Sequence, residues 1–186
     1  MLIGMPSPVP SISISTVVEL VNEWATVPQE VSLHPWAGYP GADNHARAEL
    51  RQVWPQELPE PGDEMIVEAA DRIHTVFSAT WPNDVASALT GLVSELRISP
   101  MATSRNDEVH TGWSVPDQGD LLTVMLAVSL LDHLKIEPTS RLGICESSSC
   151  ADILVDHSPS RSKHYCSARC RTRERVRDHR ARNTNS

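Results

Sequence analysis

The four cysteines of this chain form two close pairs near its C-terminus, and this spacing constrains the fold more than any other feature. Four residues separate Cys145 from Cys150, fifteen separate Cys150 from Cys166, and three separate Cys166 from Cys170. Such pairs, divided by an insert of hairpin size, are typical of a structural zinc site, because each pair supplies one edge of a tetrahedron. The spacing predicts one structural Zn²⁺ held by these cysteines, with an iron–sulfur or redox dithiol site as the alternatives.

The same four thiolates argue against an enzyme. A catalytic zinc keeps one coordination position open, whereas four cysteines fill all of them. His157, His164 and His179 are other candidate ligands, and we expect each to lie on the surface or in the hairpin. The chain also has no phosphate-binding glycine loop, no His-Glu-x-x-His and no Gly-x-Ser-x-Gly. The predicted protein is therefore not an enzyme and has no catalytic residues.

The cysteine segment also predicts its own local structure. The residues "ESSS" between the first two cysteines suit a tight turn, and Ser167 is placed to cap a helix whose first turn contains Cys170. Between the pairs we expect a strand, a Ser-Pro-Ser turn and a second strand. A knuckle, a hairpin and a helix around one ion make a treble-clef-like finger. A segment this small depends on zinc for most of its folding energy.

Charge divides the chain into two parts. Residues 1–140 carry six Lys and Arg against nineteen Asp and Glu, whereas residues 141–186 carry ten against five. The last helix has no apolar stripe to bury, and its planar guanidinium groups can hold phosphate oxygens or a guanine edge bidentately. We predict that this segment binds nucleic acid, although a solvated basic tail has the same composition. The predicted contact residues are Arg161, Lys163, Arg169, Arg171, Arg173, Arg175, Arg177, Arg180 and Arg182.

Apolar spacing predicts a mainly α protein. Helices are expected from Ser13 or Ser15 and over 43–54, 63–79, 82–98 and 117–134. Two short segments around a polar turn, between Ile98 and Pro116, predict a short β-hairpin. The expected organisation is a disordered leader (1–12), a helical regulatory or sensor domain (13–137), the finger with its basic helix (138–182) and a disordered tail (183–186).

The chain shows no sign of a secretory or membrane-spanning segment. The first residues lack a basic residue before their apolar stretch and are interrupted by Pro6, Pro8 and Pro10, and the longest apolar run is too short to cross a bilayer. The predicted location is the cytoplasm, where clustered cysteines more often hold a metal than form disulfides. The tryptophans are expected to pack in the core, with a ligand pocket as the alternative; they are Trp24, Trp36, Trp54, Trp81 and Trp113.

The C-terminal segment contains the motifs "RLGIC" (141–145), Cys150, "LVDHSPS" (154–160), "YCSARC" (165–170) and Arg173. Together they resemble the CGNR zinc-finger family of bacterial proteins. The family's signature departs here, since Cys170-Arg171-Thr172-Arg173 keeps only its first and last letters. Upstream, "VELVNEW" (18–24) and "GDLLTVMLAVSLLDHL" (119–134) resemble more loosely the helical domain of stress-induced transcription regulators that accompanies this finger. The resemblance implies the same four cysteine ligands and a role in transcription.

The combined expectation is a DNA-binding transcriptional regulator. The finger and its arginine helix would contact DNA, while the helical domain would sense a small-molecule ligand, form a homodimer or contact a protein partner. Two alternatives remain from the sequence. One is an RNA-binding protein, and the other is a zinc-finger interaction module whose basic helix docks on an acidic partner, such as its own N-terminal domain.

Overall fold

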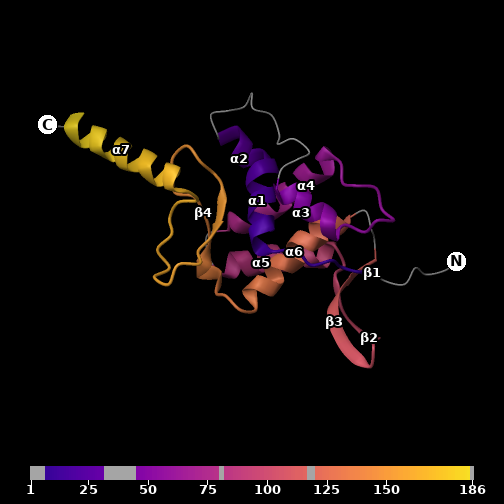
Figure 1. Ribbon diagram of the computed structural model, residues 1–186. Helices are drawn as coiled ribbons and strands as arrows, with labels where there is room; N and C mark the ends of the chain where they lie inside the picture. Colours follow the sequence, from indigo (N-terminus) through magenta and orange to yellow (C-terminus); the bar gives the residue numbers. More distant parts are fainter. Residues whose placement is uncertain (1–6, 32–44, 80–81, 117–119, 185–186) are drawn as a thin grey trace.

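The computed structural model of the protein describes residues 7–31, 45–79, 82–116 and 120–184. Its helices are α1 (Ile14–Trp24), α2 (Thr26–Val31), α3 (His45–Val53), α4 (Asp63–Phe77), α5 (Pro82–Glu95), α6 (Leu121–Leu134) and α7 (Ala168–Thr184), with a 3-10 turn at Thr139–Arg141. Its strands are β1 (Ser7–Pro8), β2 (Ser99–Arg105), β3 (Glu108–Val115), β4 (Leu142–Ile144) and β5 (Ile153–Val155). This confirms the predicted mainly α class, with a small C-terminal finger that ends in a helix (Figure 1).

Helix α6 forms the centre of the helical body. Ten consecutive residues, 121–130, are buried, because a helix that is apolar on all sides must be covered on all sides. Helices α1, α4 and α5 pack around it. At the start of α1, the backbone N–H of Thr16 donates to Ser13 Oγ at 3.1 Å, which confirms Ser13 as the N-cap.

The body helices follow the predictions closely, with one addition. Helices α3, α4 and α5 lie within the expected ranges, and the first two residues of the range 43–54 lie outside the described residues. Helix α2 was not predicted. Its first residue, Thr26, donates from its backbone N–H and from its hydroxyl to the Asp71 carboxylate of α4, at 2.6 Å and 2.7 Å. A bond between residues so distant in sequence leaves no local signal.

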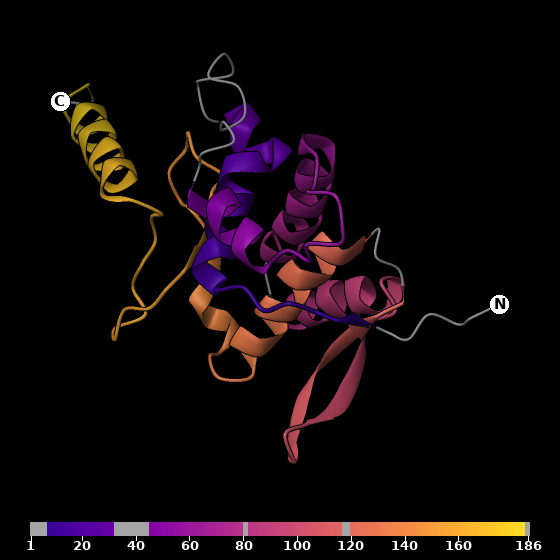
Figure 2. The ribbon, with the colours of Figure 1, turned by 45° about the vertical axis from the view of Figure 1, so that its right-hand side comes forward.

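The predicted hairpin is present, and it pairs with part of the predicted leader. Strands β2 and β3 are antiparallel and join through Asn106 and Asp107, whose positive φ values suit a two-residue hairpin turn. Strand β1 adds to the other edge of β3, and the N–H of Val9 donates to the Trp113 carbonyl at 2.9 Å. Residues 7–9 of the predicted leader are therefore paired with the sheet. The hairpin extends away from the body (Figures 1 and 2).

The second sheet joins the finger to the body and differs from the predicted one. Strand β5 pairs with β4, which precedes Cys145, so the predicted second strand after the Ser-Pro-Ser turn is wrong. Instead, the carboxylate of Asp156 accepts from the backbone N–H groups of Ser158 at 2.7 Å and Lys163 at 3.0 Å. The side chain of Ser158, together with these N–H groups of Lys163 and Ser158, lowers the pKa of Asp156 to about 2. The carboxylate thus accepts from loop N–H groups that would otherwise donate to the carbonyls of a partner strand.

The strand β5 shares the core of the helical body. Ile153 and Val155 are buried within the same apolar cluster as α1, α4 and α6. The side chain of Asn22 in α1 binds both backbone groups of Ile153, accepting from its N–H at 2.7 Å and donating to its carbonyl at 3.0 Å. Finger and body are therefore joined by apolar packing and by hydrogen bonds. Among the described helices, none has the length and apolar character needed to cross a membrane.

Candidate metal centre

The four cysteines converge from two parts of the chain on one small volume. All four Sγ atoms lie within 4.8 Å of one another, and none of the cysteines forms a disulfide. The Sγ of Cys166 lies 3.7 Å from that of Cys150 and 3.6 Å from that of Cys170. A tetrahedral zinc with Zn–S bonds of about 2.3 Å separates its sulfurs by about 3.8 Å. The donor set and its spacing therefore fit one structural Zn²⁺, as predicted.

Local hydrogen bonds place each sulfur. The first pair forms a knuckle directly after β4, where the N–H of Cys145 donates to the Asp152 carbonyl at 2.8 Å and that of Cys150 donates to the Ser147 carbonyl at 3.0 Å. The second pair opens α7. Ser167 Oγ accepts from the N–H of Cys170 at 3.3 Å, which confirms the predicted cap. Capping at this position turns Cys170 back toward the other sulfurs.

The sulfurs need a cation to be held as thiolates. Burial raises the pKa of Cys150 to about 12 and also raises the pKa of Cys166. A zinc ligand must be the charged thiolate, so the ion has to offset this cost of desolvation. Zinc binding at this site therefore releases protons, and the affinity for zinc falls as the pH is lowered.

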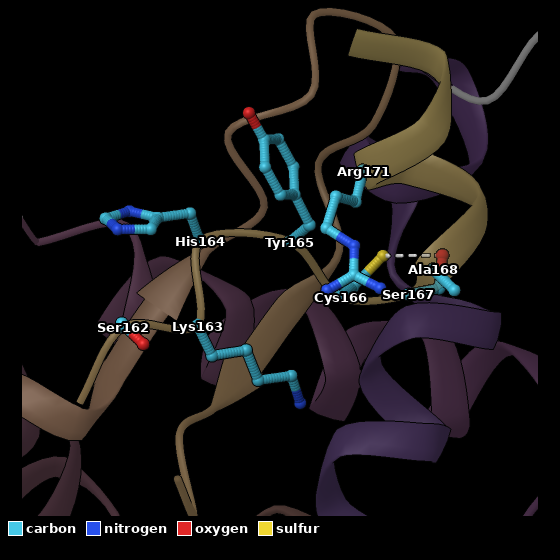
Figure 3. A pocket seen from close by; sticks show the side chains of 8 residues that line it. All are labelled: Ser162, Lys163, His164, Tyr165, Cys166, Ser167, Ala168 and Arg171. Carbon is cyan, nitrogen blue, oxygen red and sulfur yellow. Dashed lines mark hydrogen bonds between the residues drawn. The ribbon is translucent and has the colours of Figure 1, made fainter. Parts of the chain in front are cut away.

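The alternative histidine ligands do not join the cluster. Among the described residues, only the four cysteines form the metal-binding group. His164 Nδ1 lies 2.9 Å from Glu146 Oε1, and Figure 3 shows its ring pointing away from Cys166. His179 contacts Asn183, and the ring of His157 packs edge-on against that of His133 on α6. The expectation that these histidines are not ligands agrees with this geometry.

A second layer of contacts ties the knuckle to α7, and the sequence did not predict it. The carboxylate of Glu174 is buried and accepts hydrogen bonds from Ser147 and Ser148. Burial alone would raise the pKa of Glu174, but these bonds and the charge of Arg177 lower it, so the group stays ionised. The neighbouring Arg173 donates to Ser149, at 2.6 Å to its Oγ and 3.3 Å to its carbonyl.

All nine predicted contact residues are exposed, but they are not equivalent. Arg173 is engaged by Ser149, and Arg177 pairs with Glu174 at 2.9 Å. Arg171, Arg175 and Arg182 repeat at intervals of four and seven residues, which places them on one flank of α7. Figure 3 shows Arg171 reaching back toward Cys166 and Ser167. The helix itself points away from the body in both ribbon views (Figures 1 and 2).

Comparison with protein families agrees with this site. Residues 141–183 match the family model of the CGNR zinc finger, which confirms the resemblance predicted for the cysteine segment. The match includes both cysteine pairs and nearly all of α7, and it stops short of the helical body. The looser likeness of 18–24 and 119–134 to a regulator domain therefore stays a prediction. No curated protein matches the chain.

Proposed function

We propose that the CGNR zinc finger of this protein presents α7 to duplex DNA and that the protein acts as a transcriptional regulator. The observation that carries the proposal is α7 itself. It has seventeen residues and seven arginines, and it projects from the body with zinc ligands at its start. Of its residues 168–183, only Cys170 and Glu174 are buried. A helix that buries so few of its residues against its own protein is available to contact a partner molecule.

The spacing of the arginines supports a duplex as the partner. Arg171 and Arg182 are eleven residues apart, which is about 16 Å along a helix. Arg169 and Arg180 lie on the opposite flank, since they follow a different helical row. A helix with cations along both flanks can lie in a major groove and reach the phosphates of both strands.

Composition favours DNA over RNA. The major groove of A-form RNA is too narrow for a helix, and single-stranded RNA is usually held on aromatic side chains. Tyr165 is the only Phe, Tyr or Trp after residue 140. The acidic part of the chain, with nineteen Asp and Glu against six Lys and Arg in residues 1–140, repels DNA and confines contact to the finger.

The helical body is proposed to sense a ligand, form a homodimer or contact a protein partner. Of the tryptophans suggested for a pocket, Trp24 and Trp54 are core residues, whereas Trp36 and Trp81 lie outside the described residues. Trp113 lines a hollow between the hairpin and α6, together with Met101, Asp132 and Lys135. This hollow combines an aromatic ring with both signs of charge and is our candidate for the ligand site.

Neutralising one flank of α7 is expected to reduce the salt dependence of DNA binding. The double variant Arg171→Gln with Arg175→Gln removes two exposed charges that lie one turn apart. Each lost phosphate contact makes the negative slope of log affinity against log salt shallower by about 0.9. The magnitude of the slope should therefore decrease by about 2. The measurement is a salt titration of fluorescence anisotropy with zinc-loaded protein and duplex DNA.

The control removes the same net charge from the body. Arg51→Gln with Lys135→Gln breaks two surface ion pairs, with Glu60 and Asp132, and both residues lie in the helical body outside the matched finger (141–183). This variant should keep the wild-type slope. Equal slopes for all three proteins would refute the proposal that α7 is the DNA-binding element.

A further inference from the structure

Glu174 does not behave like the rest of α7. Apart from the zinc ligand Cys170, residues 168–183 of the helix are exposed, yet Glu174 is only 4% exposed. It is an acid in a helix whose proposed role is to bind an anion, so its charge opposes that role. A buried carboxylate is costly unless it is well bound, which points to a structural task.

The three serines between Cys145 and Cys150 all contact this part of α7. Glu174 Oε1 accepts from Ser147 Oγ at 2.9 Å, from the Ser148 N–H at 2.9 Å and from Ser148 Oγ at 3.1 Å. Ser149 accepts from the guanidinium of Arg173, at 2.6 Å to its hydroxyl. A turn that reads as generic polar sequence is thus bound along its length to the basic helix.

These contacts fix the direction of α7, which the metal alone does not do. Zinc would hold α7 at Cys170, in its first turn, and one fixed point leaves a helix free to pivot. Glu174 lies four residues further along the same face, about 6 Å from that point. Two fixed points define the direction of an axis. The helix has no apolar stripe that could do the same by packing.

We propose that Glu174 and Arg173, bound by Ser147, Ser148 and Ser149, form a lock that sets the direction of α7 relative to the helical body. Glu174 is a positioning residue in this lock. It holds the flank with Arg171 and Arg175 in a fixed orientation. DNA binding then costs little conformational entropy of the helix. The effect of the lock on DNA binding rests on the proposed function, whereas its effect on the direction of α7 does not.

The direction of α7 can be measured without DNA. Residual dipolar couplings of backbone amides in the zinc-loaded full-length protein should fit one alignment tensor for α4, α6 and α7. In Glu174→Ala, zinc should stay at one per chain, while the couplings of α7 shrink and those of α4 and α6 keep their values. Couplings of α7 that still fit the common tensor in Glu174→Ala would overturn the lock. If this variant loses zinc, Ser147→Ala with Ser148→Ala removes the two hydroxyl donors instead and leaves only the Ser148 N–H among the serine donors to Glu174. The same comparison of the α7 couplings with the common tensor then tests the lock.

The affinity for duplex DNA provides a second test, because the lock and a simple charge effect predict changes in opposite directions. Removal of an acid from a DNA-binding helix raises affinity if only charge matters. The lock predicts that Glu174→Ala weakens binding by about tenfold, because a loose helix must be ordered on the DNA. The control is Asp178→Ala, which removes the other acid of α7 from an exposed position and should keep or raise the affinity.

Failure of the lock and failure of the proposed DNA-binding function give different results. If Glu174→Ala binds DNA as tightly as Asp178→Ala, the lock does not position the helix for binding and the proposal fails. If the wild-type protein binds no DNA, the proposed function fails, and the dipolar couplings still test the lock.

Discussion

Replacing Cys166 by serine is expected to remove zinc from the finger and to abolish the proposed binding of DNA by the full-length protein. Cys166 Sγ lies within 3.7 Å of two other sulfurs, so its loss breaks the tetrahedron. Structural zinc contributes about 10–16 kcal/mol in small finger peptides, more than this finger can recover from packing. Of α7 residues 168–183, only two are buried, and one of these is the ligand Cys170. Metal analysis by mass spectrometry and a duplex-binding assay measure the two losses.

A matched control is Ser167→Ala, one residue further along. It removes the hydroxyl that caps α7 and costs about 1 kcal/mol, but it leaves all four sulfurs in place. This variant should retain one zinc per chain and bind DNA. A metal-free Cys166→Ser protein that binds duplex DNA with wild-type affinity would contradict the account of a zinc-built finger.

Replacing Ile153 by aspartate is expected to unfold the body and the finger together. Ile153 is fully buried in the core cluster of the helical body, and its backbone groups are both bound by Asn22. A charge placed there is uncompensated, and such changes cost about 4–5 kcal/mol or more. That is a large share of the roughly 5–15 kcal/mol by which a typical domain is stable. Circular dichroism should show loss of helix at 25 °C, and zinc should be bound weakly.

Two controls separate this effect from general sensitivity. Ile153→Val keeps the site apolar and should cost about 1 kcal/mol, with a single unfolding transition. Ile136→Asp changes a residue that is 85% exposed and should leave the melting temperature nearly unchanged. If Ile153→Asp loses only its zinc while the helices of the body melt at the wild-type temperature, the two parts do not share a core.

The zinc ligands could be predicted because their information is local. Cysteine is rare in this chain, all four copies lie within one short segment, and their spacing leaves few alternatives. The cap at Ser167 and the helices with a regular apolar period, such as α1 and α4, depend on neighbours within one or two turns and were predicted for the same reason.

The features that the sequence did not reveal depend on distant partners. Strand β5 was expected to pair across the nearby Ser-Pro-Ser turn, but the N–H groups of that loop bind Asp156, and β5 pairs with β4 instead. Its "ILV" run gives no sign that it completes the core of another segment.

The buried contacts of Glu174 could not be predicted for the same reason. An acid among arginines suggests a surface ion pair, and only the folded chain brings Glu174 against serines 26 and 27 residues away. The sequence of α7 contains two acids, Glu174 and Asp178, and nothing in it distinguishes the buried one from the exposed one.

The central claim is that a zinc-held arginine helix binds duplex DNA, and a salt titration of the full-length, zinc-loaded protein tests it most directly. Anisotropy should be followed on duplex DNA and on RNA of matched sequence. We predict binding to the duplex with a slope of log affinity against log salt of roughly −5, as for about six phosphate contacts, and weaker binding to RNA. One zinc per chain with no measurable binding to duplex DNA at low salt would contradict the claim and would make the finger an interaction module for an acidic protein.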